Sequence, residues 1–165
     1  ARCTVMKNGK KLILLVAVAL TACGCQKAIF ESQLKAYVVR SGTDEVELNT
    51  LVFTDDDIVS YNTETKVLVF KDKMPTLKAL CSAGLAASEL EIFLGAKSVC
   101  NVLLTSGYDS RGYPQPTIDY AEYFEPKEEC FHFSAGYPTS EFSEPQYLKD
   151  FERIVNHWRR IGKCK

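Results

Sequence analysis

The feature that most constrains this chain is an uncharged apolar run near its start. Residues 12–22 form 11 consecutive positions without a charge, and Lys7, Lys10 and Lys11 precede them. A helix that spans a membrane needs about 20 apolar residues, so this run is too short to remain as a transmembrane anchor. A basic stretch followed by a short apolar run and small residues is the pattern of a secretory signal. The sequence therefore predicts that this leader directs export and takes no part in the fold.

The end of the apolar run narrows the kind of signal. Leu20-Thr21-Ala22-Cys23 resembles the lipobox of bacterial lipoproteins, in which a lipid is attached to the cysteine thiol and the leader is cut before it. The resemblance implies that Cys23 is the lipid attachment site and the first residue of the mature chain. Cys25 is a poorer candidate because no aliphatic residue stands three places before it. An ordinary secretory signal and a short buried strand are the alternative interpretations.

Cleavage before Cys23 divides the chain into three predicted parts. Residues 1–22 are the signal with the residues upstream of it, 23–34 are a lipidated tether, and 35–165 are one α+β domain. The 143 residues that remain are enough for a single domain with its own core.

Charge limits the partners of this domain. The chain has 20 basic and 21 acidic residues, and the leader contains four of the basic ones, so the mature chain is near -5. Binding of nucleic acid needs basic surface that replaces counterions. We therefore expect no nucleic-acid partner, and a contact with the membrane through the N-terminal lipid alone.

The cysteine count leaves the disulfide pattern open. Export permits disulfides, but after Cys3 and Cys23 are set aside an odd number remains, so at least one thiol is left over. No pair has the C-x-x-C spacing of a thioredoxin-like redox site or a zinc ribbon. We expect no cofactor and no metal. The remaining cysteines are Cys25, Cys81, Cys100, Cys130 and Cys164.

Hydrophobic patterning predicts an α+β fold. Alternating apolar residues between turn signals indicate strands, and short Gly-containing turns between them indicate hairpins. A stripe of apolar residues at helical spacing, from Leu148 to Trp158, indicates a long C-terminal helix with Ser143 as its cap. We expect an antiparallel sheet of about six or seven strands, built from hairpins and covered by this helix. The expected strands are 36–40, 45–53, 66–70, 88–94, 98–104, 117–124 and 130–133, with a short helix over 77–85.

One acidic cluster, Thr54-Asp55-Asp56-Asp57, invites a calcium interpretation. The EF-hand loop requires a glycine at its sixth position and a closing glutamate, and this sequence has neither. Thr54 as a helix cap, with Asp56 and Asp57 favoured by the helix dipole, is the simpler account. We expect a short helical turn that continues through residues 59–61.

Catalytic residues are scarce. The chain has two histidines and no G-x-S-x-G, H-E-x-x-H or P-loop motif. Cys130 and His132 alternate onto one face of a predicted strand, which leaves Phe131 and Phe133 toward the core. A Cys/His nucleophile pair or a two-ligand metal site is one interpretation, and a disulfide cysteine beside a surface histidine is the simpler one. We expect His157 on the surface of the last helix.

Tyrosine is concentrated in one part of the chain, since five of the eight tyrosines lie between 108 and 137. Tyrosine offers a large, rigid contact surface with a polar tip, which suits binding of proteins or sugar rings. Tyr108, Tyr113 and Tyr137 are the expected exposed contacts. Ordinary packing of hairpin and core aromatics is the alternative.

The order of these segments resembles a type of small lipoprotein common in Bacteroidetes. The resemblance rests on the lipobox, on residues 52–70, on the hairpin over 90–104, and on Gly136-Tyr137-Pro138 before a helix that ends in His157-Trp158. It implies location and fold, and it carries over no activity. Surface-exported lipoproteins of these bacteria often have an acidic run after the lipidated cysteine. Gly24-Cys25-Gln26-Lys27 lacks one, which favours the periplasmic face.

Together these features predict a membrane-tethered lipoprotein of the bacterial cell envelope. Its domain is expected to be a non-catalytic binding module for a protein or glycan partner. The alternative is an envelope hydrolase or thiol-redox enzyme that uses Cys130 and His132.

Overall fold

The computed structural model describes residues 33–84, 86–107, 110–122 and 129–165. Cys23 with its lipobox, and Tyr108, lie outside these ranges. The described chain begins with β1 (Leu34–Arg40), β2 (Leu51–Thr54), the 3-10 turn η1 (Asp55–Asp57), β3 (Ile58–Tyr61) and β4 (Val67–Phe70). It continues with α2 (Pro75–Ser82), β5 (Ser88–Leu94), β6 (Lys97–Ser106), β7 (Thr117–Glu122), β8 (Glu129–Ser134), the 3-10 turn η2 (Ser140–Phe142) and α3 (Pro145–Arg160).

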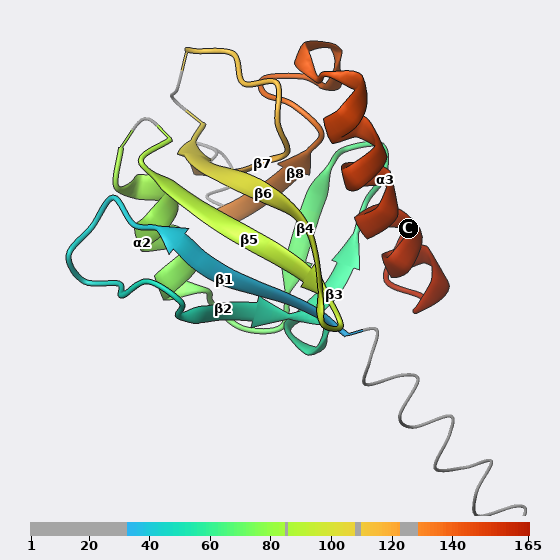
Figure 1. Ribbon diagram of the computed structural model, residues 1–165, viewed down its shortest axis with the longest axis horizontal. Helices are drawn as coiled ribbons and strands as arrows, with labels where there is room; N and C mark the ends of the chain where they lie inside the picture. Colours follow the sequence, from blue (N-terminus) through green and yellow to red (C-terminus); the bar gives the residue numbers. More distant parts are fainter. Residues whose placement is uncertain (1–32, 85, 108–109, 123–128) are drawn as a thin grey trace, which may run out of the picture.

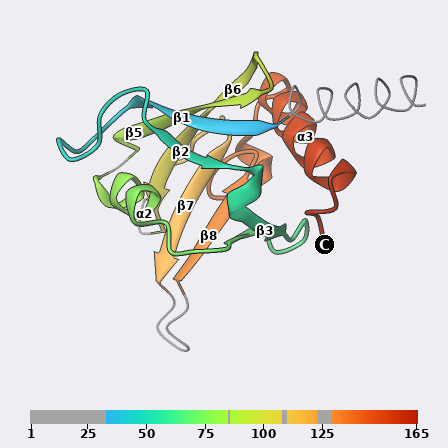
Figure 2. The same cartoon turned by 90° about the horizontal axis from the view of Figure 1, so that it is seen from below.

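The strands form one mixed sheet in the order β2-β1-β5-β6-β7-β8-β4-β3. The predicted α+β class is confirmed, but the predicted six or seven strands are wrong, because the described chain has eight. An entirely antiparallel sheet built from hairpins is also wrong, since β6 and β7 run parallel with Leu104 opposite Ile118. The sheet curls almost into a barrel (Figures 1 and 2), and η1 connects the two strands at the ends of the order.

The acidic cluster forms the predicted cap, although its helix is shorter than expected. The Asp56 N–H donates to Thr54 Oγ1 at 3.2 Å, and the Thr54 N–H donates to Asp57 Oδ2 at 2.7 Å, which makes a capping box. The turn stops after Asp57 because Ile58 and Val59 are β-branched and favour a strand. The helical turn expected over 59–61 is therefore wrong, and these residues belong to β3.

Two of the predicted hairpins are confirmed, those of β5 with β6 and of β7 with β8. Gly95 has a φ of 63° in the first, a value that glycine adopts at no steric cost. β1 and β2 also pair antiparallel, but residues 45–49 are not a strand and β2 begins only at Leu51. The expected strand over 66–70 is confirmed as β4, and Val69 on it is 42% exposed.

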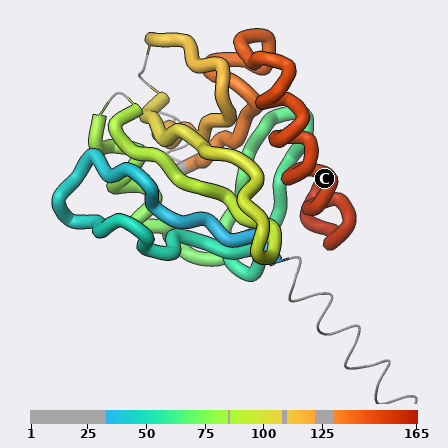
Figure 3. The backbone as a smooth tube through the Cα atoms, in the orientation of Figure 1, coloured from blue at the N-terminus to red at the C-terminus, as the bar shows by residue number. Residues whose placement is uncertain are grey.

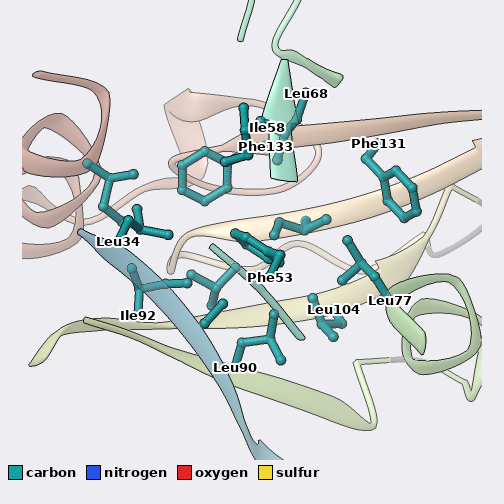
Figure 4. Packing of buried hydrophobic residues seen from close by; sticks show 14 of the residues in the cluster. Leu34, Phe53, Ile58, Leu68, Leu77, Leu90, Ile92, Leu104, Phe131 and Phe133 are labelled. Atoms are coloured by element: carbon teal, nitrogen blue, oxygen red, sulfur yellow. The ribbon is translucent and has the colours of Figure 1, made fainter. Parts of the chain in front are cut away.

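The hydrophobic core fills the inside of the curled sheet. α2 packs against β6 and β7, and its Leu77 and Leu80 are fully buried. α3 adds Phe151, Val155 and Trp158 to the core, as the predicted apolar stripe required. Figure 4 shows the central cluster, which includes Leu34, Phe53, Ile58, Leu68, Leu90, Ile92, Leu104, Phe131 and Phe133.

The two ends of the described domain lie on the same side of the molecule (Figure 3). α3 begins at Pro145, a residue whose missing N–H suits the first position of a helix, so the expected Ser143 capping box does not form. After α3, residues 163–165 run beside β3. The Tyr61 N–H donates to Lys163 O at 2.8 Å, and the Lys165 N–H donates to Tyr61 O at 2.9 Å. These bonds cover the edge of β3, which would otherwise present unpaired backbone groups.

Candidate functional site

The two described tyrosines of the predicted binding surface hold the protein's own backbone together. Tyr113 and Tyr137 form an antiparallel bridge, with N–H···O distances of 2.9 and 3.0 Å, and their ring centroids are 6.1 Å apart. Tyr113 is half-buried, and Tyr137 is only 8% exposed. The expectation of an exposed contact at Tyr137 is therefore wrong, because its ring belongs to the packing between two segments.

Close backbone packing explains why these segments meet. A Cβ atom at Gly136 would lie 2.9 Å from the Ser143 nitrogen and 3.1 Å from Tyr113 O, both of which are backbone atoms. Only glycine fits where two backbones approach this closely. In the described part of the tyrosine-rich region, Tyr113 and Tyr137 therefore form a contact within the protein. Its role in binding stays a prediction.

Cys130 and His132 lie on one face of β8, as predicted, with Phe131 and Phe133 buried on the other. His132 stands opposite Asp119 of β7, and its Nδ1 is 3.6 Å from Asp119 Oδ2. That separation is an ion-pair distance and too long for a hydrogen bond. The sequence analysis did not single out Asp119, although the register of the predicted hairpin places it beside His132.

The thiols of the core are poor nucleophiles. In the part of the chain that the structure describes, no disulfide joins any of its four cysteines. Burial raises the pKa of Cys81 far above its usual range, and it raises the pKa of Cys100 to about 12. The thiolate is the reactive form, so both side chains stay protonated and inert. Within the same ranges no group of three or more His, Cys, Asp or Glu side chains is placed to hold a metal ion.

A buried polar cluster centred on Asp55 is the site that sequence reasoning missed. The Leu34 N–H donates to Asp55 Oδ2 at 2.8 Å, and Trp158 Nε1 donates to Asp55 Oδ1 at 3.1 Å. His157 Nε2 lies 2.7 Å from Asp55 Oδ2, and His157 is only 5% exposed, so its expected surface position is wrong. Arg160 lies 3.1 Å from His157 Nδ1. Since a guanidinium only donates, Nδ1 accepts and Nε2 carries the hydrogen to Asp55.

Every described donor of this cluster has an acceptor, and the Asp55 carboxylate has three hydrogen-bond partners. Asp55 is 7% exposed and Trp158 is 1% exposed, which leaves no room for a substrate beside them. The cluster therefore fixes α3 against η1 and the start of β1, a structural role.

A groove of about 850 Å³ lies between β4, β8 and the start of α2. It exists because two neighbouring strands diverge. β4 pairs with β8 only at Val67–His132 and Leu68–Phe131. Beyond Leu68, Val69 and Phe70 pair with β3 and with no other described strand. The walls are largely apolar, and Lys78, whose Nζ lies 4.8 Å from the centroid of the Tyr120 ring, stands at one side. The other lining residues include Val69, Phe70, Met74, Cys130 and Phe131.

Comparison with known proteins adds no assignment. No family model, curated protein or solved structure matches this chain. Among the described residues, no helix has the length and apolar character needed to cross a membrane.

Proposed function

We propose that this protein is a lipid-anchored lipoprotein of the bacterial cell envelope, on the periplasmic face, and that its domain binds a partner and catalyses no reaction. The lipobox at Cys23 supports the anchor, and the resemblance to Bacteroidetes lipoproteins supports the location. Ten residues, 24–33, separate Cys23 from the first strand. Extended chain covers at most about 3.6 Å per residue, so the tether keeps the domain within about 40 Å of the membrane.

The observation that carries the binding role is the groove between β4 and β8. A strand whose edge is open can pair with an extended segment of another protein, which gains main-chain hydrogen bonds and places alternate side chains in pockets. Val69 supplies exposed apolar surface at this edge, and Phe131 lines the groove beneath it. These features favour a protein partner with an extended apolar segment over a glycan.

Substitution of Val69 tests this function. Val69→Asp places a charge on the apolar wall and should reduce, by about tenfold or more, the partner recovered after cross-linking in intact envelopes. Val59→Asp is the matched control, because Val59 is 46% exposed on β3 and does not line the groove. Equal recovery from both variants would remove the groove from the proposal. Loss of recovery on glycosidase treatment, with protease having no effect, would assign the groove to a glycan.

The anchor is tested separately by the mass of the protein extracted from membranes. We expect the mature chain to begin at Cys23 and to carry the mass of attached lipid. Cys23→Ala should release the protein from the membrane fraction while its groove still captures the partner. A mature chain that begins at any other residue would exclude the anchor and leave the binding role to be judged on Val69.

A second candidate function is the thiol enzyme that uses Cys130 and His132, and the position of Asp119 favours it. A carboxylate beside a histidine orients the imidazole as a base for a nucleophile, and Asp119 is 3.6 Å from His132. Titration with an alkylating reagent discriminates between the two functions. An activated thiol reacts at a pH well below the ordinary cysteine pKa of about 8.5, and His132→Asn should abolish that reactivity. A Cys130 that reacts no faster in the native protein than in the His132→Asn variant excludes the enzyme.

A further inference from the structure

A second cavity, of about 460 Å³, lies between α3 and the turn that joins β3 to β4. It shares no lining residue with the groove between β4 and β8. Figure 1 shows α3 passing beside β3 and β4 on this side of the molecule. Cavities of roughly 300 to 1,000 Å³ hold small molecules in proteins. The pocket therefore has room for a ligand the size of one sugar ring.

The floor of the pocket is apolar and rigid. Tyr61 is fully buried, and its hydroxyl donates to Phe133 O at 2.9 Å, so the ring is fixed with its polar tip turned inward. Phe151 and Val155, from the buried side of α3, complete the floor and are 9% and 5% exposed. An apolar floor of this kind contacts the ring carbons of a ligand and leaves specificity to the rim.

The rim carries two cations that are held by neutral oxygens. Lys66 Nζ donates to Thr63 O at 2.5 Å, and Arg159 donates to Asn156 Oδ1 at 2.7 Å. Over the ranges that the structure describes, neither Lys66 nor Arg159 takes part in an ion pair. Two cations are thus positioned at one pocket while their charge is not neutralised.

The turn beneath Lys66 is built to hold this geometry. Asn62 Oδ1 accepts from the N–H groups of Glu64 and Thr65, each at 2.9 Å. Lys66 has a φ of 63°, a conformation uncommon outside glycine, and its carbonyl accepts from the Phe133 N–H at 2.9 Å. The bonds on both sides of Lys66 fix its backbone, so a ligand would meet a site that is already formed.

The charge balance of the pocket points to an anion. Glu152 is the one carboxylate among its lining residues, against Lys66 and Arg159, so the pocket is locally positive. The chain as a whole has a net charge of -1, so this pocket differs in sign from the chain. Arginine binds carboxylates through two parallel hydrogen bonds, while Ser140 and Glu152 on the rim suit the hydroxyl groups of a sugar.

We propose that this pocket binds a sugar acid, a single sugar ring that carries a carboxylate. The carboxylate lies between Lys66 and Arg159, the ring carbons contact the floor at Phe151, and the ring hydroxyls bond to Ser140 and Glu152. The proposal depends on neither the lipid anchor nor the groove between β4 and β8, so failure of the proposed function leaves it standing.

Titration calorimetry of the full domain with three probes tests the proposal. Glucuronic acid should bind, and glucose, which lacks the carboxylate, should bind at least tenfold more weakly. Lys66→Gln and Arg159→Gln should each weaken the binding of glucuronic acid by about tenfold, because each removes a charge-assisted hydrogen bond to the carboxylate. The affinity of glucuronic acid should fall as salt is added. Inorganic phosphate, the third probe, should bind more weakly than glucuronic acid because it makes no contact with the floor.

Arg153→Gln is the matched control. Arg153 is on the same helix, pairs with Asp150 at 3.2 Å, and does not line the pocket. It should leave the affinity unchanged, and the urea midpoint of each variant establishes that the fold is intact. Absence of glucuronic acid binding, equal affinity for glucose, or unchanged affinity in both pocket variants would overturn the proposal. Inorganic phosphate that binds as tightly as glucuronic acid would overturn the assignment to a sugar.

Discussion

Asp55 Oδ2 lies 2.7 Å from His157 Nε2, although the two residues are 102 positions apart in the sequence. This contact joins η1, which connects the two end strands of the sheet, to the last turn of α3. The same carboxylate accepts from Leu34 at the start of β1. One buried side chain therefore links the beginning, the middle and the end of the domain.

Replacement of Asp55 by alanine should be among the most destabilising single changes in the protein. It would leave the donors of Leu34, His157 and Trp158 buried without an acceptor. A buried donor left without an acceptor costs about 1–3 kcal/mol, so three such donors should cost about 3 kcal/mol or more. We expect a loss of that size in the free energy of unfolding, measured by urea denaturation.

Asp56→Ala is the control for this prediction. Asp56 is exposed, and its carboxylate accepts only from the Gln33 amide at 3.0 Å among the described contacts. A surface change of this kind alters stability by about 0.5 kcal/mol or less. If the Asp55 and Asp56 variants unfold at the same urea concentration, the cluster does not hold the domain together.

The buried thiols give the protein a stability that depends on pH. Burial raises the pKa of Cys100 from 9.0 to about 12, and it raises that of Cys81 further. Above pH 9.0 the cysteine thiols of the unfolded chain lose their protons, while the same thiols in the folded chain keep theirs. Stability is therefore fully present below pH 9.0 and is lost as the pH rises toward about 12.

Cys100→Ala removes the contribution of Cys100 to the pH dependence of the free energy of unfolding. Each thiol contributes a fall of about 1.4 kcal/mol for each pH unit within its window. We measure how far the free energy of unfolding falls between about pH 8 and about pH 10. This fall should be smaller in the variant than in the original protein by about 1.4 kcal/mol. Identical differences in the two proteins would mean that the Cys100 thiol titrates normally.

Local patterns predicted the local parts of this fold. The β5–β6 hairpin follows from an alternating strand on each side of Gly95, whose φ of 63° the turn requires. The apolar stripe of α3 predicted the burial of Phe151, Val155 and Trp158 in the same way. In each case residues close in sequence determine one another's position.

The remaining features depend on contacts between distant segments. Ile58 and Val59 favour a strand, but a strand of four residues is too short to show an alternating pattern that would reveal its pairing with β4. The parallel pairing of β6 and β7 brings Leu103 beside Thr117, two residues whose local sequence patterns carry no sign of each other. His157 appears polar and peripheral until Asp55 is placed beside it. The positive pocket was missed for the same reason, since Lys66 and Arg159 are 93 positions apart in the sequence.

Two glycines in the tyrosine-rich region should respond differently to alanine. A Cβ at Gly136 would meet backbone atoms at 2.9 and 3.1 Å, which cannot move without shifting the chain. A Cβ at Gly112 would meet the ring of Phe142 at 2.9 Å, but that ring is 54% exposed and can rotate away. We expect Gly136→Ala to lower the free energy of unfolding by about 1–3 kcal/mol and Gly112→Ala to lower it less. The reverse order, measured in urea, would contradict the close approach of the two segments.

The place at which the domain begins gives the last prediction. The sequence analysis put Leu34 in the tether, but β1 begins at this residue, and its side chain is fully buried in the core. A chain that starts at Gln33 should therefore be as stable as the full-length chain, while one that starts at Ala36 should lose several kcal/mol in its free energy of unfolding. A buried leucine is worth about 2–5 kcal/mol when it is truncated to alanine, and the donor to Asp55 is lost as well. Leu34→Ala separates the two contributions, because it keeps the backbone N–H and removes only the side chain. Equal urea midpoints for the chains that start at Gln33 and at Ala36 would show that the first two residues of β1 contribute nothing to the stability of the fold.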